Sequence, residues 1–176
     1  MDNYIYAYYQ QIKDGTVLVG RWVRLLYENI IQALEDGVYL YDPDKANDAV
    51  EWIEKYCHHT EGPLAPDNIK LELWQKAALS VIFGIVDADG LRIFREIVLV
   101  VARKNGKTSL IAALAWAMAI LQRKSGSTCY IVANAMKQAL QAFNFILFSL
   151  QYSGIVEQFK VINNSFDHSI EYIFKK

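Results

Sequence analysis

Glycine, lysine and threonine stand together at Gly106, Lys107 and Thr108, between an apolar run and a long helical pattern. A phosphate group needs several hydrogen-bond donors that converge on it, and a glycine turn at the start of a helix supplies backbone N–H groups in that arrangement. The three residues match the end of the P-loop pattern G-x-x-x-x-G-K-[ST], but Val101 occupies the position of its first glycine. The motif is short, so its weight depends on the elements around it.

The placing of these residues predicts a site for ATP with Mg²⁺. The backbone N–H groups from Asn105 to Thr108 would face the phosphates, and Gly106 would let the backbone approach them closely. Lys107 would bridge the β- and γ-phosphates, and the Thr108 hydroxyl would hold Mg²⁺. The alternative is an ordinary turn glycine before a solvated helix start. The apolar runs on either side favour the phosphate site.

Two further cations lie inside the loop. Arg103 is predicted to contact the γ-phosphate through two parallel hydrogen bonds and to act as an arginine finger supplied by the same chain, which makes it the catalytic candidate. Its alternative is a surface side chain. Lys104 is interpreted as an exposed lysine without a role in the site.

The elements before the loop are predicted as helices over residues 4–15, 21–37 and 42–59. Asp42 is expected to cap the third helix, with Pro43 in its first turn. Cys57 to His59 are expected to form its solvated end, because neighbouring residues on a helix do not face one site. The second helix is expected to bury one apolar face, made of Trp22, Leu25, Leu26, Ile30, Ala33 and Leu34.

The stretch "TEGPLAPDN" is predicted to be a linker, which places a domain boundary near residue 65. Beyond it we expect an alternation of helices over 69–85, 107–124 and 135–151 with buried strands over 94–102 and 127–134, the second strand burying Cys129. Short strands are possible at 157–163 and 168–174. The order predicts an α/β protein, with an N-terminal helical region (1–65) followed by the first part of a P-loop parallel sheet with flanking helices (66–176).

Composition narrows the class of protein. Of 176 residues, 53% are hydrophobic and 21% are charged, which is typical of a globular chain. No apolar run is long enough to span a membrane, and the first residues lack the pattern of a signal peptide. The two cysteines have no metal-ligand spacing, which indicates a reduced, intracellular setting. Residues up to Leu91 carry a net charge of −8 and the remainder +7, so the second half is the one expected to meet an anion.

Four stretches resemble the large terminase subunit of tailed bacteriophages: "AVEWIEKYCHHTEGPLAPDNIKLELWQ", "LELWQKAALSVIFG", "ARKNGKTSLIAALA" and "YIVANAMKQALQAFNFI". The resemblance that they carry extends over nearly the whole chain. A cradle that lacks the first glycine and gains an arginine is typical of that family. The resemblance implies an ATPase that packages viral DNA into procapsids in the cytoplasm of the bacterial host. It also implies that Gln75 contacts adenine, whose edge a carboxamide matches as donor and acceptor at once.

The same resemblance implies partners for the full-length subunit: double-stranded viral DNA, the portal and the small terminase subunit, with a homo-oligomeric ring as the working form. Direct DNA binding by this chain is not expected, because its basic residues gather around the loop, where ATP accounts for them. No membrane partner is expected.

Hydrolysis needs carboxylates that hold the metal and orient water. After Thr108 the only acids are Glu157, Asp167 and Glu171, and none follows a strand-like apolar run. The second acidic motif and the nuclease domain of the family are therefore absent from these residues. We expect the isolated chain to bind ATP but to lack groups for efficient hydrolysis, as the N-terminal portion of a longer subunit would.

Other functions remain open at this stage. A helicase or another P-loop translocase would share the loop, whereas a nucleotide kinase would be expected to keep a glycine at Val101. A further alternative is a non-catalytic helical interaction module, in which residues 1–65 contact a neighbouring subunit and the cradle is vestigial.

Overall fold

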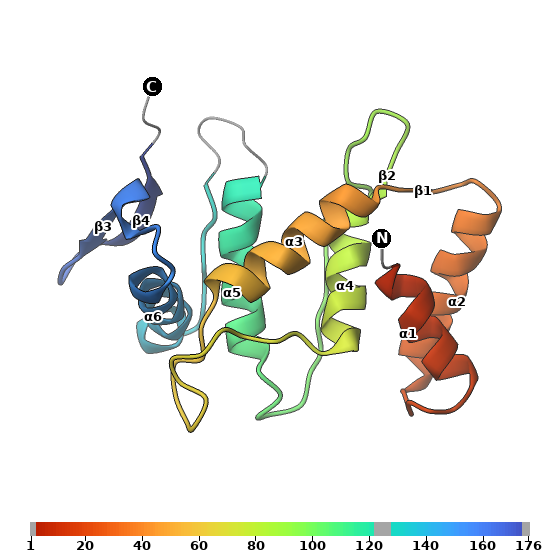
Figure 1. Ribbon diagram of the computed structural model, residues 1–176, viewed down its shortest axis with the longest axis horizontal. Helices are drawn as coiled ribbons and strands as arrows, with labels where there is room; N and C mark the ends of the chain where they lie inside the picture. The colour runs from red at the N-terminus through yellow and green to blue at the C-terminus, as the bar shows by residue number, and fades with distance from the viewer. Residues whose placement is uncertain (1–2, 122–127, 174–176) are drawn as a thin grey trace. The chain divides into compact units, whose positions relative to one another are not determined.

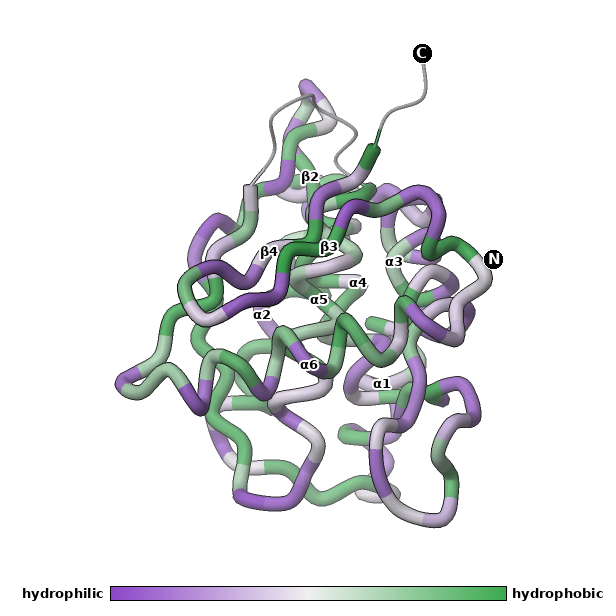
Figure 2. The backbone as a smooth tube through the Cα atoms, turned by 90° about the vertical axis from the view of Figure 1, so that its left-hand side faces the viewer, coloured by the Kyte–Doolittle hydropathy of each residue, from purple (hydrophilic) through white to green (hydrophobic). Residues whose placement is uncertain are grey.

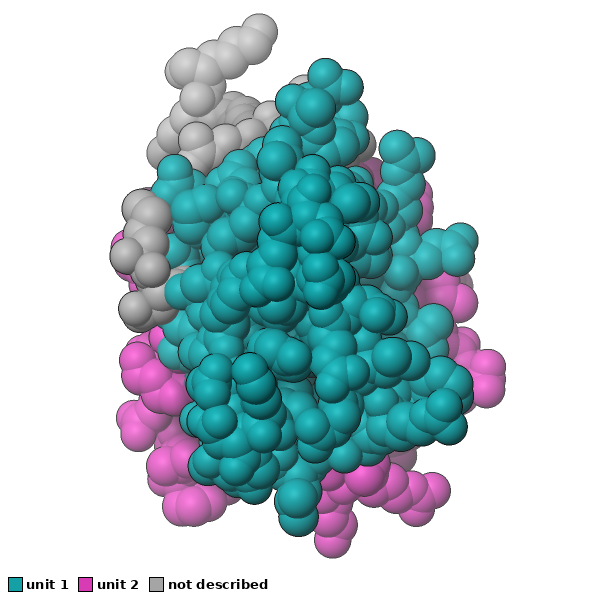
Figure 3. Space-filling view, turned by 90° about the vertical axis from the view of Figure 1, so that its right-hand side faces the viewer, with its two compact units in different colours: residues 1–50, 71–100 teal, residues 51–70, 101–176 magenta. Residues whose placement is uncertain are grey.

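The computed structural model describes residues 3–121 and 128–173. Packing divides the chain into two compact units, which Figure 3 shows in different colours: unit 1 holds residues 1–50 and 71–100, and unit 2 holds residues 51–70 and 101–176. These units divide the chain elsewhere than near residue 65, and the two predicted domains stay a prediction. No helix in the described ranges is both long and apolar enough to cross a membrane.

Unit 1 is built mainly from helices (Figure 1). Its elements are α1 (Tyr4–Lys13), α2 (Arg21–Glu35), β1 (Leu40–Tyr41), the first part of α3 (Pro43–Tyr56), α4 (Leu73–Gly84) and β2 (Ile85–Val86). The sequence forms them through local signals. The Asn3 side chain accepts hydrogen bonds from the N–H groups of Ile5 and Tyr6 at the start of α1, and Asp42 accepts one from the N–H of Lys45 at the start of α3.

The core of unit 1 lies where α1 packs against α2 and α4. Ile5 and Ile12 of α1 are fully buried there, and the rings of Tyr8 and Tyr27 meet edge to face with centroids 5.1 Å apart. Gly84 lets α4 approach the start of α3, because a Cβ atom at this position would lie 2.9 Å from the Cβ of Ala46. The helices predicted at α1, α2 and α4 are confirmed.

The predicted buried face of α2 is wrong in part. The structure buries Tyr27, Ile30 and Ile31, whereas Trp22, Leu25 and Leu26 are exposed. The helix carries apolar residues on two opposite sides, and α1 covers only one of them. A periodic pattern identifies apolar faces, but the neighbouring helix decides which face is buried.

Unit 2 holds the remaining elements. They are the second part of α3, α5 (Lys107–Leu121), α6 (Met136–Tyr152), the 3₁₀ turn η1 (Val156–Gln158), β3 (Phe159–Asn163) and β4 (His168–Tyr172). Trp116 of α5 forms the centre of an aromatic cluster, with its ring centroid 5.7 Å from that of Trp52 and 6.0 Å from that of Phe159. Apolar and polar residues follow one another along α6 (Figure 2), and its apolar side packs on α5.

The two short strands predicted near the end of the chain are confirmed. β3 and β4 pair antiparallel, with Val161 opposite Ile170, and the hairpin packs against α6. Asn164 shapes the turn between them, since its side-chain oxygen accepts hydrogen bonds from the N–H groups of Phe166 and Asp167.

The two predicted buried strands are wrong for the described residues. Residues 95–102 and 128–134 form no strand there, and most of their apolar side chains are exposed, with Val98 89% exposed. Cys129, predicted to be buried, is exposed as well. A buried parallel strand needs a neighbouring strand to pair its backbone groups. The sheets found among the described residues are β1–β2 and β3–β4, both antiparallel. The α/β class therefore holds, whereas this part of the chain shows no parallel sheet.

Candidate functional site

The loop between the extended stretch and α5 has a specific backbone shape. Lys104 and Gly106 both adopt the left-handed conformation, with φ of +67° and +66°. α5 begins at Lys107, and the N–H of Leu110 donates to the Gly106 carbonyl at 2.9 Å to close its first turn. The first N–H groups of a helix have no acceptor within that helix and carry the positive end of its dipole. The loop therefore places free donors and positive charge at one exposed point.

Asn105 shapes this loop through its side chain. Its Nδ2 donates to the carbonyls of Ala102, at 3.4 Å, and Arg103, at 3.3 Å. The sequence analysis assigned Asn105 only a backbone donor and missed this role. The signal was available, because asparagine side chains commonly bond to nearby backbone in turns and tolerate left-handed neighbours.

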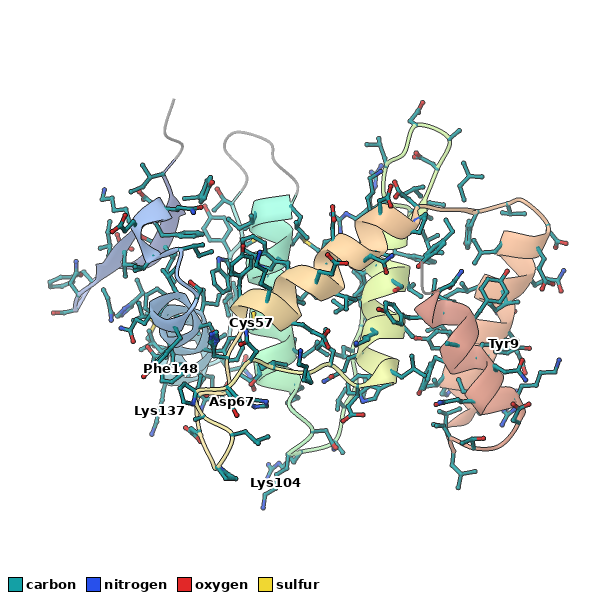
Figure 4. The ribbon with its side chains drawn as sticks, in the orientation of Figure 1. Tyr9, Cys57, Asp67, Lys104, Lys137 and Phe148 are labelled. Carbon is teal, nitrogen blue, oxygen red and sulfur yellow. The ribbon has the colours of Figure 1, made fainter. Side chains whose placement is uncertain are left out.

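The charged side chains of the loop point into solvent. Arg103, Lys104 and Lys107 are exposed, and none of them takes part in an ion pair found among the described residues. In Figure 4 the Lys104 side chain extends away from α5. Unpaired cations next to a helix start suit an anionic ligand.

The residues present fit a phosphate better than a free metal ion. Thr108 is exposed at the start of α5 and offers one hydroxyl oxygen. No cluster of three His, Cys, Asp or Glu side chains that could hold a metal occurs in the described part of the chain. Glu171 lies 3.7 Å from the Lys160 ammonium on the hairpin, and Glu157 lies in η1. The Thr108 hydroxyl is the side-chain oxygen at this helix start that could hold a metal ion bound to a phosphate.

Gln75 lies in the first turn of α4 and belongs to unit 1, so it is described by itself. Its Oε1 accepts the N–H of Glu72 at 2.8 Å, and Glu72 in turn accepts the N–H of Gln75, which forms a capping box. The cap uses one of the two lone pairs of the Gln75 Oε1. The hydrogens of Nε2 stay available for a ligand, since a carboxamide carries both kinds of group.

The segment that contains Cys57 and His58 is buried, which corrects the predicted solvated helix end. The thiol of Cys57 is fully buried, and burial raises its pKa to about 12, which keeps it protonated and unreactive. His58 is 5% exposed, and its backbone N–H donates to the Ser149 hydroxyl at 3.0 Å. Nothing in the sequence indicated that α6 would cover His58.

The predicted linker is a folded loop within unit 2. The N–H of His59 donates to the carbonyl of Asp67, and the N–H of Ile69 donates to the carbonyl of Cys57, both at 2.9 Å. Prolines and glycine end a helix, but they do not by themselves make a segment flexible. Cys57 and Asp67 are labelled in Figure 4.

Comparison with known proteins gives a consistent result. The family described as "Terminase large subunit, ATPase domain" matches residues 73–174, more than half of the chain. The terminase large subunits of Lactococcus phage p2 and Lactococcus phage SK1 are each 26% identical over 140 residues, which cover 75% of this chain and 24% of each relative. The aligned part thus spans about a quarter of those relatives, and no solved structure matches. The chain belongs to the family of terminase large subunit ATPase domains.

Proposed function

We propose that this chain carries the ATP-binding part of a phage DNA-packaging motor. One observation carries the proposal: the loop of residues 103–106 leads into the start of α5 with two left-handed residues and exposed, unpaired cations. Family membership supports nucleotide as the anion. The loop's free backbone donors supply the convergent contacts that a polyphosphate needs.

Each residue of the loop has a proposed part. The backbone N–H groups of Asn105 to Thr108 bind the phosphates, and Lys107 neutralises the β- and γ-phosphates as a flexible point charge. Arg103, being planar and permanently charged, takes the γ-phosphate through two hydrogen bonds and is the catalytic candidate. The Thr108 hydroxyl holds the Mg²⁺ that accompanies ATP, and the ion would supply charge neutralisation there.

Gln75 is the proposed adenine contact. With its Oε1 in the capping box, Nε2 is the group left to donate to a ring nitrogen of adenine. While the cap is closed, Oε1 can accept from adenine only through its second lone pair. Discrimination by Gln75 alone is therefore expected to be modest.

Hydrolysis and packaging need groups beyond these residues. We propose that the carboxylates that hold the metal and orient water come from outside these residues. The acids after Thr108 lie on η1, on the hairpin turn and on β4. We propose that double-stranded DNA, the portal and the small terminase subunit are partners of the complete subunit, that a homo-oligomeric ring is its working form, and that it acts in the host cytoplasm. The isolated chain should bind ATP without efficient turnover.

The test is a titration of the purified chain with ATP and Mg²⁺, followed by calorimetry. Lys107→Ala removes a charge-assisted contact worth about 1.5–3 kcal/mol, so the affinity should fall about 10- to 100-fold. Lys104→Ala is the matched control, since it deletes another exposed lysine of the same loop and should leave the affinity within about twofold.

Two outcomes would contradict the proposal. Equal ATP affinity for Lys107→Ala and the unmodified chain would rule out the proposed phosphate site. A melting temperature that does not change with millimolar ATP would favour a vestigial cradle, because a ligand that binds the folded state raises it. Efficient phosphate release by the isolated chain would leave the site in place but would show that no hydrolytic group is missing.

A further inference from the structure

Helix α2 of unit 1 has a second apolar face that points into solvent. Its inward side buries Tyr27, Ile30 and Ile31 against unit 1. On the opposite side, apolar residues spaced three or four positions apart along the chain are exposed. Leu18 is 91% exposed and Trp22 is 75% exposed. This outer stripe consists of Leu18, just before the helix, and Trp22, Leu25 and Leu26 on it, with the polar Asn29 one turn further along.

One edge of the outer stripe carries four charged residues in a particular order. Arg21 and Arg24 come first, then Glu28 and Glu35, all exposed and all on the same side of the helix by its 3.6-residue period. None of the four takes part in an ion pair found among the described residues. Arg21 contacts its own neighbour, with the guanidinium carbon 5.6 Å from the Trp22 ring centroid.

The order of these charges does not help the helix itself. Cations near the N-terminus and anions near the C-terminus oppose the helix dipole, and α2 has no acid in its first turn and no base in its last. The arrangement lowers the stability of α2 in isolation, so it is better explained by a surface that these charges would complement.

We propose that the outer stripe of α2 binds the outer stripe of a second copy of this chain, in antiparallel orientation. A two-fold axis perpendicular to the two helices brings the same edge of each helix together. Arg21 and Arg24 of one copy then lie beside Glu28 and Glu35 of the other, with the axis near Leu26. A parallel pair would place the charged edge against the opposite edge, which carries Val23 and no charge.

The size of the surface sets the strength of this contact. A helix of 15 residues is about 22 Å long, and one apolar stripe per copy is small beside the interfaces of permanent dimers. The dimer is therefore weak and concentration-dependent, and the charged edges decide its orientation more than its affinity. Such a two-fold contact closes at two copies, so it is separate from the contacts that would build the proposed ring. It also does not depend on the ATP site.

The test uses two charge-reversed forms of the full chain in sedimentation velocity. Arg21→Glu with Arg24→Glu makes the edge wholly acidic, and Glu28→Arg with Glu35→Arg makes it wholly basic. Each alone should dimerise at least about tenfold more weakly than the unmodified chain, because like charges then face each other. An equimolar mixture of the two should recover a heterodimer. The new charges near the helix ends follow the helix dipole, so both forms are expected to fold.

The matched control reverses two exposed charges of unit 1 away from the stripe, Lys13→Glu with Asp89→Arg, and should dimerise as the unmodified chain does. Trp22→Ser deletes the largest side chain of the stripe and should abolish dimers in every background. Three results would each overturn the proposal: a monomer at all concentrations, self-association that survives both charge reversals, or two reversed forms that fail to associate when mixed although circular dichroism shows them folded.

Discussion

Unit 1 contains helices that pair their own backbone groups and an extended stretch that forms no strand. Helices α1 and α4 pair their backbone groups within themselves and close a core around Ile5 and Ile12. The extended stretch from Arg95 to Val100 has apolar side chains of the same kind, yet it lies exposed and forms no strand. The difference lies in what each backbone needs. A helix satisfies its own N–H and C=O groups, whereas a strand requires a neighbour.

The comparison bears directly on the candidate site. The loop of residues 103–106 has an exposed, unpaired stretch on one side and the packed helix α5 on the other. Its shape must therefore come from α5 and from bonds inside the loop, such as those of the Asn105 side chain. A strand on the first side would normally share this task.

The largest expected effect tests the energetic contrast between the two segments. Ile12→Ala empties a fully buried site and should lower the free energy of unfolding by about 2–5 kcal/mol. Val98→Ala truncates a side chain that is 89% exposed, and should change it by less than about 0.5 kcal/mol. Urea denaturation of both variants measures the two values. A loss for Val98→Ala as large as that for Ile12→Ala would break the comparison, since it would show that the stretch is packed.

An effect of intermediate size concerns the bonds that hold the loop. If the Asn105 amide supports the left-handed turn at Lys104, Asn105→Ala should weaken ATP binding by about 1 kcal/mol, or roughly fivefold. Lys104→Gly should recover much of that loss in the double variant, because glycine adopts a positive φ at little cost. Calorimetric titration with ATP and Mg²⁺ measures each step.

The control is the melting temperature without ligand, which should be nearly the same in all these variants because the loop is exposed. The interpretation fails if Asn105→Ala binds ATP as the unmodified chain does. It also fails if Lys104→Gly in the Asn105→Ala background weakens binding further, since flexibility rather than strain would then govern the loop.

The sequence predicted best what depends on neighbouring residues. The sequence indicated the cap at Asp42, the glycines that end α1 and α2, and the helical period of α3. These three helices are confirmed. The start of α5 at Lys107 was predicted for the same reason. Both short strands of the hairpin were predicted as well, because their partner lies a few residues away.

Features that depend on distant partners could not be predicted in this way. The apolar run at Ile97–Val101 is typical of a buried strand, but burial requires other strands that the described residues do not place beside it. In the opposite sense, Cys57 and His58 follow the last turn of α3 and were expected in water. They are buried because Ser149 of α6 accepts the His58 N–H, a contact 91 positions away in sequence.

The smallest expected effect concerns the pH dependence of stability in the buried loop around His58. This loop has no regular secondary structure, like the exposed stretch, but it is packed, like the helices. Burial lowers the pKa of His58, the charge of nearby His59 lowers it further, and Asp67 opposes both. The unfolded chain therefore takes up a proton at a higher pH than the folded chain does. The contribution of neutral His58 to the free energy of unfolding is fully present above the ordinary histidine pKa of about 6.5. It is lost as the pH falls below that value.

Urea denaturation at several pH values between about 7 and 5 measures this slope. His58→Gln should flatten this slope, because it removes the buried imidazole. An identical slope in the unmodified chain and His58→Gln would mean that the loop admits water around the imidazole. The loop would then belong with the exposed stretch before α5 rather than with the packed helices, and the hydrogen bond to Ser149 would hold only its backbone.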